Sequence, residues 1–246
     1  MPEISTHPPH SPRDSNSPPV GNRLLDTLDS TQLVDLLSHS TIVALDLAQI
    51  VHEPNEFFQY IYFPTDGVIS ILCVMEDGQQ AEVSAIGREG MIGSALALGV
   101  DRTPARAIVQ IQGAAVRMSV DEFTASIAHD EVLSALLGHY IQSLLVHSAQ
   151  TIACNQLHTI QKRFARWLLQ VSDCMNSDEF TLTQEFMSQM LMVRRASVSA
   201  VAYRMKKSGL ISYSRGKIRV LDRTRLEAAS CECYQAVEQE YKRLIM

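Results

Sequence analysis

The residues best suited to recognising a partner are two arginines and two serines near residue 195. Arg194 and Arg195 are followed by Ser197 and Ser199, at the start of a run whose apolar residues recur at helical spacing. A guanidinium group fits the two acceptors on the major-groove edge of guanine, and cations and hydroxyls bind phosphates. The pattern therefore predicts DNA recognition by the first turns of a helix. The alternative is a solvated cationic helix in an ordinary helical hairpin.

Two short helices and a β-hairpin are expected to position these side chains. The first helix follows Thr183, which has an N-capping side chain, and the second helix ends before Gly209. In the segment LISYSRGKIRVL, apolar residues alternate around Arg215-Gly216, which predicts a two-stranded wing. Helix, turn, helix and wing is the arrangement that places the second helix in the major groove of DNA.

This interpretation assigns different tasks to the cationic residues. Arg195 is expected to recognise guanine, whereas Arg194, about 100° round the helix, is aimed at the DNA backbone. Arg215 and Lys217 in the wing are expected to meet phosphates. The full predicted DNA-binding set is Thr183, Arg194, Arg195, Ser197, Ser199, Arg204, Arg215 and Lys217.

The charge is divided unevenly along the chain, although the net charge of -6 is that of an acidic protein. Residues 161–246 contain 15 Lys and Arg against 9 Asp and Glu, a net charge of +6, so residues 1–160 carry -12. Because of this asymmetry, only the C-terminal part is expected to attract phosphate. It is the distribution expected of a sensor joined to a DNA-binding module.

The composition places the chain among globular proteins of the cytoplasm. A length of 246 residues is enough for two domains, and no apolar run approaches the roughly 20 residues that span a bilayer, so no membrane partner is expected. The N-terminus lacks the features of a secretory signal. Residues 1–20 are rich in Pro, Ser and His and are predicted to be a disordered tail. Five irregularly spaced cysteines do not indicate a disulfide framework.

Residues 21–129 are predicted to form the sensor domain. A helical segment within residues 22–39 is followed by seven or eight short strands, separated by turn signals such as Pro64–Gly67 and Glu76–Gly78. No segment of helical length separates these strands, which favours an antiparallel β-roll or jelly roll over a parallel sheet. The predicted fold class is therefore α+β.

A long amphipathic helix, residues 130–155, is predicted to join two copies of the chain. Six of its residues are separated by alternating steps of four and three, which defines a heptad seam: Leu133, Leu137, Tyr140, Leu144, His147 and Thr151. Leu136, Ile141, Leu145 and Ile152 broaden the apolar stripe. A stripe of this width predicts a parallel homodimer; the alternative is a monomeric helix with one wide buried face.

The sequence shows no catalytic constellation, so no enzyme activity, catalytic residue, metal site or cofactor is expected. Cys231 and Cys233 lack further ligands at zinc-like spacing, and the segment CECY is interpreted as an ordinary helix end. The competing functional hypothesis is a ligand-binding or protein-interaction module without DNA-binding activity.

The order of helix, β-roll, long helix and winged helix-turn-helix resembles the Crp/Fnr superfamily of bacterial transcription regulators. The resemblance is carried by YFPTDGVISIL, MEDGQQAEVSAIGREGMIG, RFARWLLQVSD, LTQEFMSQMLMVRRASVS and KSGLISYSRGKIRVLDRTRLE, and extends from about residue 22 onward. It implies a winged helix-turn-helix domain at 156–246. It also implies a homodimer on a palindromic double-stranded operator, RNA polymerase as a further partner and a small-molecule effector.

The resemblance also constrains the effector and the operator. Family members that bind cyclic nucleotides use a Gly-Glu pair for the ribose and an Arg-Ser pair for the phosphate; here the matching positions are Gly93-Ser94 and Ala105-Arg106. The missing carboxylate implies an effector other than cyclic AMP, in a pocket with Gly93, Ser94 and Arg106. An iron–sulfur cluster is not expected, since the first cysteine is Cys73.

The resemblance also implies that the predicted reading helix prefers an operator sequence different from that of the best-known family members. Ala196 and Ala200 replace an acidic and a basic base-reading residue of the best-known members. Met192 stands where the family usually has glycine, so either Met192 is strained by roughly 1 kcal/mol or the turn is reshaped.

Overall fold

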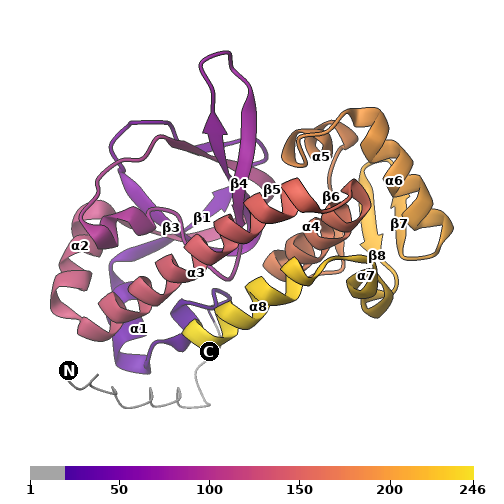
Figure 1. The fold of residues 1–246 in the computed structure, drawn as a ribbon. Helices are drawn as coiled ribbons and strands as arrows, with labels where there is room; N and C mark the ends of the chain where they lie inside the picture. The colour runs from indigo at the N-terminus through magenta and orange to yellow at the C-terminus, as the bar shows by residue number, and fades with distance from the viewer. Residues whose placement is uncertain (1–19) are drawn as a thin grey trace, which may run out of the picture.

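A computed structural model describes residues 20–246, so the predicted tail, apart from Val20, lies outside the described residues. Figure 1 shows a β-rich part and a C-terminal helical part, with the long helix α3 running between them. The helix α8 returns from the C-terminal part and lies along α3. None of the described helices is long and apolar enough to cross a membrane.

The β-rich part is an antiparallel roll, as predicted. Its strands pair in the order β1-β5-β3-β4, and β2 adds to β5. The elements are η1 (Leu25–Thr27), α1 (Ser30–Ser38), β1 (Ser40–Leu45), β2 (Ile50–His52), β3 (Tyr60–Val74), β4 (Gln80–Ile86), η2 (Ser94–Leu98) and β5 (Ala105–Ser119). The sequence offers either Asp29 or Ser30 as the cap of the first helix; Asp29 caps α1 by accepting hydrogen bonds from Thr31 N and Gln32 N.

The prediction of seven or eight short strands was wrong, because β3 and β5 are each 15 residues long. The expected turn at Pro64–Gly67 lies inside β3, where the pairing with β5 shifts register three times between Pro64 and Ile69. Gly67 has φ 83°, and a Cβ there would lie 2.7 Å from the Ile111 carbonyl oxygen. The glycine therefore lets two bent strands approach closely and remain paired. The other expected turn, at Gly78, is confirmed between β3 and β4.

Three helices lead from the roll to the C-terminal part: α2 (Val120–His129), α3 (Glu131–Leu157) and α4 (Ile160–Met175). Each begins at a side chain that accepts backbone N–H groups of its first turn, namely Ser119, Asp130 and Thr159. In α4, helical spacing of the apolar residues Phe164, Trp167 and Leu168 predicts that Arg166 points outward, and this prediction is wrong. The Arg166 side chain is only 4% exposed and donates to Thr151 Oγ1 at 3.1 Å.

The C-terminal part is the predicted winged helix-turn-helix with two additions. It contains β6 (Glu179–Thr181), α5 (Gln184–Met190), α6 (Arg195–Lys207), β7 (Ile211–Ser214), β8 (Lys217–Val220), α7 (Arg223–Ala229) and α8 (Glu232–Ile245). The strand β6 pairs with β8 and makes the wing three-stranded. The helical spacing in α6 buries Val198, Val201, Ala202 and Met205, as predicted. The second addition, α8, extends the domain beyond the wing.

The helix α8 packs along α3 and reaches the roll, while Tyr234 near its start stays in the core of the C-terminal part. Tyr241 and Ile245 join the core that contains Leu24 and Met91, and Tyr241 Oη donates to the Glu89 carbonyl at 2.7 Å. The sequence-based boundary at residue 156 assigns α8 to the DNA-binding domain. In the folded chain this helix ties the end of the sequence to the sensor part.

The packing of α3 corrects the predicted dimer seam. Leu133, Leu137 and Tyr140 are 3%, 0% and 1% exposed within one chain. Tyr140 Oη also accepts a hydrogen bond from Met91 N at 3.0 Å. The other seam residues, Leu144, His147 and Thr151, are partly buried in the same chain. The heptad pattern therefore marks the side of α3 that packs inside the chain, and a second copy cannot use its buried part.

The opposite side of α3 is exposed and has a heptad pattern of its own. Its residues, again separated by alternating steps of three and four, are Ala135, Gly138, Gln142, Leu145, Ala149, Ile152 and Gln156. Leu145 and Ile152 are 61% and 67% exposed, and a Cβ added to Gly138 would meet nothing within 4 Å. We call these seven residues the outer stripe of α3.

Candidate nucleic-acid interface and effector cavity

The turn between α5 and α6 positions the predicted reading helix. Thr183 Oγ1 accepts from Phe186 N at 3.1 Å and begins α5, as predicted. Met192 has φ 51°, which is the left-handed backbone conformation that glycine usually adopts at this position. The turn is therefore not reshaped. Of the two options for Met192, the structure contains the strained one, at a cost of about 1 kcal/mol. Arg194 then occupies the N-cap position of α6 and Arg195 its first helical position.

The predicted DNA-binding residues are exposed, except for Ser197 and Ser199: Arg194 and Arg195 lie at the α6 N-terminus, Arg215 and Lys217 in the wing, Thr183 at the start of α5 and Arg204 in the last turn of α6. Ser197 is half-buried. The Ser199 hydroxyl donates within the domain, with Gln184 Oε1 at 2.8 Å and the Arg195 carbonyl at 3.1 Å as its partners. Ser199 therefore braces α6 against α5, and its lone pairs remain to accept a hydrogen bond.

Ion pairing distinguishes three arginines of this domain from the predicted DNA-binding cations. Arg219 pairs with Glu179, Arg223 pairs with Asp173 and Glu227, and Arg225 pairs with Asp222. Within residues 20–246, no carboxylate pairs with the five predicted DNA-binding cations, which are Arg194, Arg195, Arg204, Arg215 and Lys217. Five uncompensated positive charges give this domain a field that attracts phosphate.

Arg195 begins the reading helix α6 and is close enough to the wing for its charge to act on Tyr213. Burial raises the pKa of the Tyr213 phenol in β7, and the charge of Arg195 acts in the opposite direction on the same group. The wing turn itself contains Arg215 with φ 50° and Gly216 with φ 83°, which suits a tight two-residue hairpin. The first turn of α6 and the wing are thus parts of one cationic surface.

A cavity of about 220 Å³ lies inside the roll and contains all three predicted effector residues, Gly93, Ser94 and Arg106. Arg106 Nε donates to Glu53 Oε2 at 2.8 Å, so its positive charge is already balanced. His52 stacks on Phe58 with ring centroids 4.1 Å apart, and its buried Nε2 has no hydrogen-bond partner. Burial lowers the pKa of His52. The rest of the wall is largely apolar, including Ile71, Ile86, Met91, Ile92 and Leu144.

Comparison with known proteins identifies the DNA-binding part. Residues 162–229 match the Crp-like helix-turn-helix domain. This part of the chain is a Crp-like helix-turn-helix domain. A comparison of the chain with curated protein sequences finds no match.

Solved structures share most of the fold of the chain. FixK2 from Bradyrhizobium japonicum has 14% sequence identity and a TM-score of 0.67, covering 78% of this chain and 98% of its own. The c-di-GMP responsive global regulator CLP of Xanthomonas campestris has 14% identity and a TM-score of 0.61, covering 79% and 100%. A putative cAMP-binding regulatory protein from Silicibacter pomeroyi DSS-3 has 22% identity and a TM-score of 0.58, covering 82% and 91%. At these identities the likeness establishes the fold, and the DNA-binding assignment depends on the matched domain.

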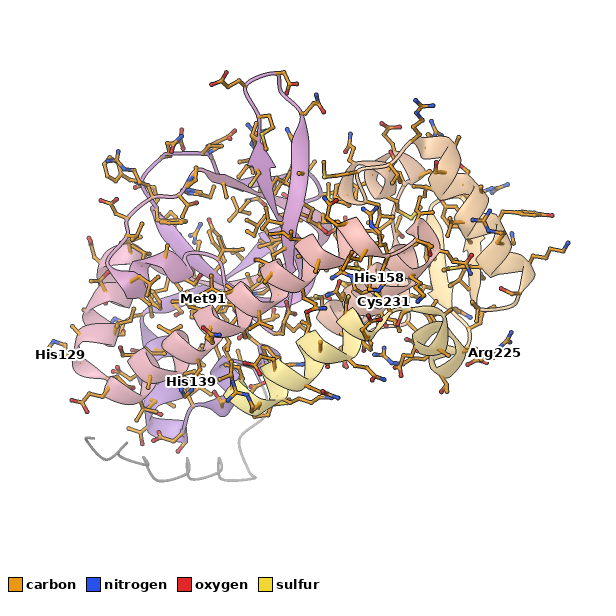
Figure 2. All side chains as sticks on the ribbon, in the orientation of Figure 1. Met91, His129, His139, His158, Arg225 and Cys231 are labelled. Atoms are coloured by element: carbon orange, nitrogen blue, oxygen red, sulfur yellow. The ribbon has the colours of Figure 1, made fainter. Side chains whose placement is uncertain are left out.

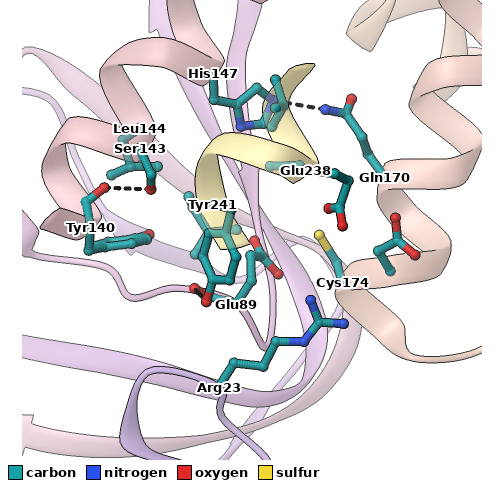
Figure 3. A pocket seen from close by; sticks show the side chains of 14 residues that line it. Arg23, Glu89, Tyr140, Ser143, Leu144, His147, Gln170, Cys174, Glu238 and Tyr241 are labelled. Carbon is teal, nitrogen blue, oxygen red and sulfur yellow. Dashed lines mark hydrogen bonds between the residues drawn. The ribbon is translucent and has the colours of Figure 1, made fainter. Parts of the chain in front are cut away.

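A smaller cavity of about 60 Å³, which the sequence did not indicate, lies where α3, α4 and α8 of the chain meet the roll (Figure 3). Glu89 and Cys174 face it, and burial raises the pKa of both groups. On α3, His147 lies with Nε2 3.1 Å from Gln170 Nε2 and Nδ1 3.4 Å from Ser84 Oγ. Burial, together with the charge of Arg166, lowers the pKa of His147 to about 4. His147 is thus a packed polar residue inside the chain.

The structure also assembles a group of ligand-type residues that the sequence interpretation missed. Cys231 and Cys233 were expected to have no further ligands, but Cys154 and His158 lie beside them, with all four candidate ligand atoms within 4.8 Å of one another. The available signal was a Cys and a His four residues apart at the end of a predicted helix. Sequence spacing could not show that this pair and the CECY segment, more than 70 residues later in the chain, come together.

Proposed function

We propose that the chain is a regulator that binds a palindromic operator as a homodimer and that a ligand in the roll cavity controls this binding. The observation that carries the proposal is a set of five cations without an ion pair within the described chain: Arg194 and Arg195 at the α6 N-terminus, Arg204 in the last turn of α6, and Arg215 and Lys217 in the wing. They stand in contrast to the ion-paired Arg219, Arg223 and Arg225 of the same domain. Cations that are left unpaired on one surface are available for phosphates and base edges.

The outer stripe of α3 is the proposed dimer interface. It combines two large exposed apolar residues, Leu145 and Ile152, with the small residues Ala135, Gly138 and Ala149 at heptad spacing. Small side chains let two helices approach closely, and the large ones fill the seam between them. A parallel pair of α3 helices would place the two DNA-binding domains side by side, as a two-fold operator requires.

The proposed effector is a compact, largely apolar molecule rather than cyclic AMP. Ser94 cannot accept the ribose hydroxyl as a carboxylate would, and Arg106 is paired with Glu53. Two solved structures of similar fold are described as a c-di-GMP responsive regulator and a putative cAMP-binding protein; at 14% and 22% identity their ligands do not carry over to this cavity. Calorimetry should detect no micromolar binding of cyclic AMP and no change in operator affinity. Micromolar binding with a parallel rise in operator affinity would refute this proposal.

Arg195→Ala should weaken binding to the selected operator by roughly 1 to 3 kcal/mol and relax base preference at one position in each half-site. The reason is that a guanidinium in the first turn of α6 can reach guanine in the major groove. The test is binding-site selection with the wild type and the Arg195→Ala variant. Arg194→Ala is the matched control, because it should lower affinity without changing the selected motif.

Identical motifs for wild type and Arg195→Ala would remove Arg195 from base recognition. If the wild type selects no motif at all, the chain acts as a ligand-binding or interaction module without DNA-binding activity. We place the regulator in the cytoplasm, with RNA polymerase as a further partner and with binding, not catalysis, as its activity. The proposed units are a tail (1–20), a sensor (21–129), a dimer helix (130–155) and a DNA-binding domain (156–246).

Lys217→Ala should weaken binding to all DNA sequences alike and reduce the salt dependence by about one unit of slope. Its ammonium group is exposed at the start of β8 and has no ion pair within the described chain. Arg219→Ala is the matched control, since Arg219 lies on the same strand and is paired with Glu179. Titrations at several salt concentrations measure both slopes. A change in the selected motif with Lys217→Ala would mean that the wing reads bases.

A further inference from the structure

Three cysteines and a histidine meet at the joint between α3, α4 and α8. Cys154 lies in the last turn of α3 and His158 is the residue that follows this helix. Cys231 is the N-cap residue of α8, and Cys233 lies in its first turn. Figure 2 shows His158 and Cys231 side by side where α3 ends and α8 begins. Three segments that are distant in sequence thus contribute ligand-type atoms to one point.

The distances suit a single tetrahedral ion. Cys154 Sγ lies 3.5 Å from Cys231 Sγ, and Cys233 Sγ lies 3.4 Å from His158 Nδ1. Around a tetrahedral zinc ion with Zn–S bonds near 2.3 Å, neighbouring sulfur ligands are about 3.8 Å apart. Small outward shifts of the side chains would complete the geometry. An iron–sulfur cluster needs room for several iron and sulfide atoms between its ligands, and a group confined within 4.8 Å does not provide it.

Neighbouring side chains orient two of the four ligands. His158 turns Nδ1 toward the sulfurs, while its Nε2 lies 3.3 Å from Glu232 Oε1. A histidine that binds a metal through one nitrogen commonly donates the other N–H to a carboxylate, which fixes its tautomer. Gln150 Nε2 donates to Cys233 Sγ at 3.2 Å, which is the hydrogen bond that a thiolate accepts. Both contacts therefore support metal-binding forms of the ligands.

The charge of such a site is also compensated. Three thiolates, one neutral histidine and one divalent ion carry a net charge of -1. Arg166 is 4% exposed, has no ion pair with a carboxylate within residues 20–246, and its charge acts on the Cys154 sulfur. Burying a guanidinium without an ion pair is costly; the buried Glu82 offsets part of that cost, and an anionic centre beside Cys154 would lower it further. Arg166, unexpected inside α4, thereby acquires a role.

Packing alone does not account for this group. Cys154, Cys231 and Cys233 are 0%, 5% and 1% exposed, and they form a separate buried cluster outside the three larger hydrophobic cores. We propose that these three thiolates and His158 bind one Zn²⁺ ion in each chain. All four ligands come from the protein, so the site is closed and structural. Neither the DNA-binding proposal nor the effector proposal is needed for this inference.

The position of the ion defines its effect. It would join the end of α3 and the α3–α4 link, through Cys154 and His158, to the start of α8. Since α8 packs on the roll and α4 begins the DNA-binding part, the ion would hold the joint between the two parts of the molecule rigid. Metal binding contributes folding free energy to the segments that it connects.

The test uses the full chain, purified under reducing conditions, with elemental analysis of bound zinc. We expect one zinc per chain in the wild type, a clear loss in Cys231→Ser, and an unchanged content in Cys73→Ser, whose cysteine is exposed on β3. Glu232→Gln should retain the ion but lower its affinity by about tenfold, because the carboxylate only positions His158. Removing the ion with a chelator should lower the melting temperature of the wild type and of Cys73→Ser.

A spectroscopic measurement on the wild type keeps the test independent of any variant that fails to fold. Replacing zinc by Co²⁺ should give thiolate-to-cobalt charge-transfer absorption and the visible bands of a tetrahedral ion. Three results would each overturn the proposal. They are a folded chain that binds neither Zn²⁺ nor Co²⁺ after reduction, iron and sulfide in stoichiometric amounts, or a Cys154–Cys231 disulfide as the state in which the chain folds.

Discussion

A chain carrying Leu145→Glu together with Ile152→Glu should sediment as a monomer. Both side chains lie on the outer stripe of α3 and are more than half exposed in one chain, so the substitutions leave the fold of the chain intact. In a parallel helix pair each glutamate would face its own copy across the seam. Two unpaired carboxylates would then lose water and repel each other, at a cost of several kcal/mol.

Loss of the dimer should also abolish specific operator binding, because a monomer holds only one half-site. We expect a decrease of roughly a thousandfold or more in operator affinity, close to the level of non-specific binding. Sedimentation velocity and a binding titration measure the two effects. Ile42→Glu is the matched control: Ile42 is 80% exposed on β1, away from α3, and this variant should stay dimeric. An unchanged mass for the double variant would place the interface elsewhere.

Acidification should destabilise the wild type through His147. Its folded pKa of about 4 lies below the ordinary value of 6.5, so the unfolded chain binds a proton more readily than the folded chain. The stabilising contribution of the neutral imidazole is therefore complete above pH 6.5 and is lost as the pH falls toward 4. A difference of about 2.5 units corresponds to at most about 3 kcal/mol.

His147→Gln should remove this pH-dependent component. The amide can keep a hydrogen bond with Gln170 or Ser84, and it does not titrate. Urea unfolding of wild type and variant, repeated between pH 7 and pH 4, isolates the histidine because the carboxylates titrate equally in both proteins. His139→Gln, an exposed change on the same helix, should follow the wild type. If wild type and His147→Gln lose stability in parallel, His147 is not the responsible group.

Local patterns determined much of the DNA-binding part. The helical spacing of Val198, Val201, Ala202 and Met205 identified the buried face of α6, and Arg215-Gly216 located the wing turn. Helix starts at Asp29 and Thr183 followed from the capping chemistry of single side chains. These features depend on neighbours a few residues away, and such information is contained in the sequence.

The course of the long strands could not be obtained in this way. Pro64–Gly67 has the composition of a turn, but it lies within β3 because β5 continues to pair with both sides of the bend. A turn residue permits a change of direction, while the partner strand decides whether the chain reverses or bulges. Pairing with residues more than 40 positions away therefore determines the conformation of this segment, against its local turn propensity.

The side of α3 that faces a partner was also beyond the sequence. Two heptad patterns exist on this helix, and the more apolar one, which includes Leu137 and Tyr140, was assigned to the dimer. A periodic pattern shows that a helix face is buried, but not which molecule buries it. In the folded chain the roll and α8 cover that face, so the outer stripe remains for a second copy.

The sequence by itself determined the order of elements, the caps, the buried face of α6 and the basic character of the C-terminal part, since each depends on residues close together or on composition. Only the tertiary structure decided the exposed face of α3, the burial of Arg166 and the meeting of Cys154 and His158 with Cys231 and Cys233. These features arise because α8 turns back along α3. The residues that direct this packing are far apart in the chain, so their spacing in the sequence does not predict the contact.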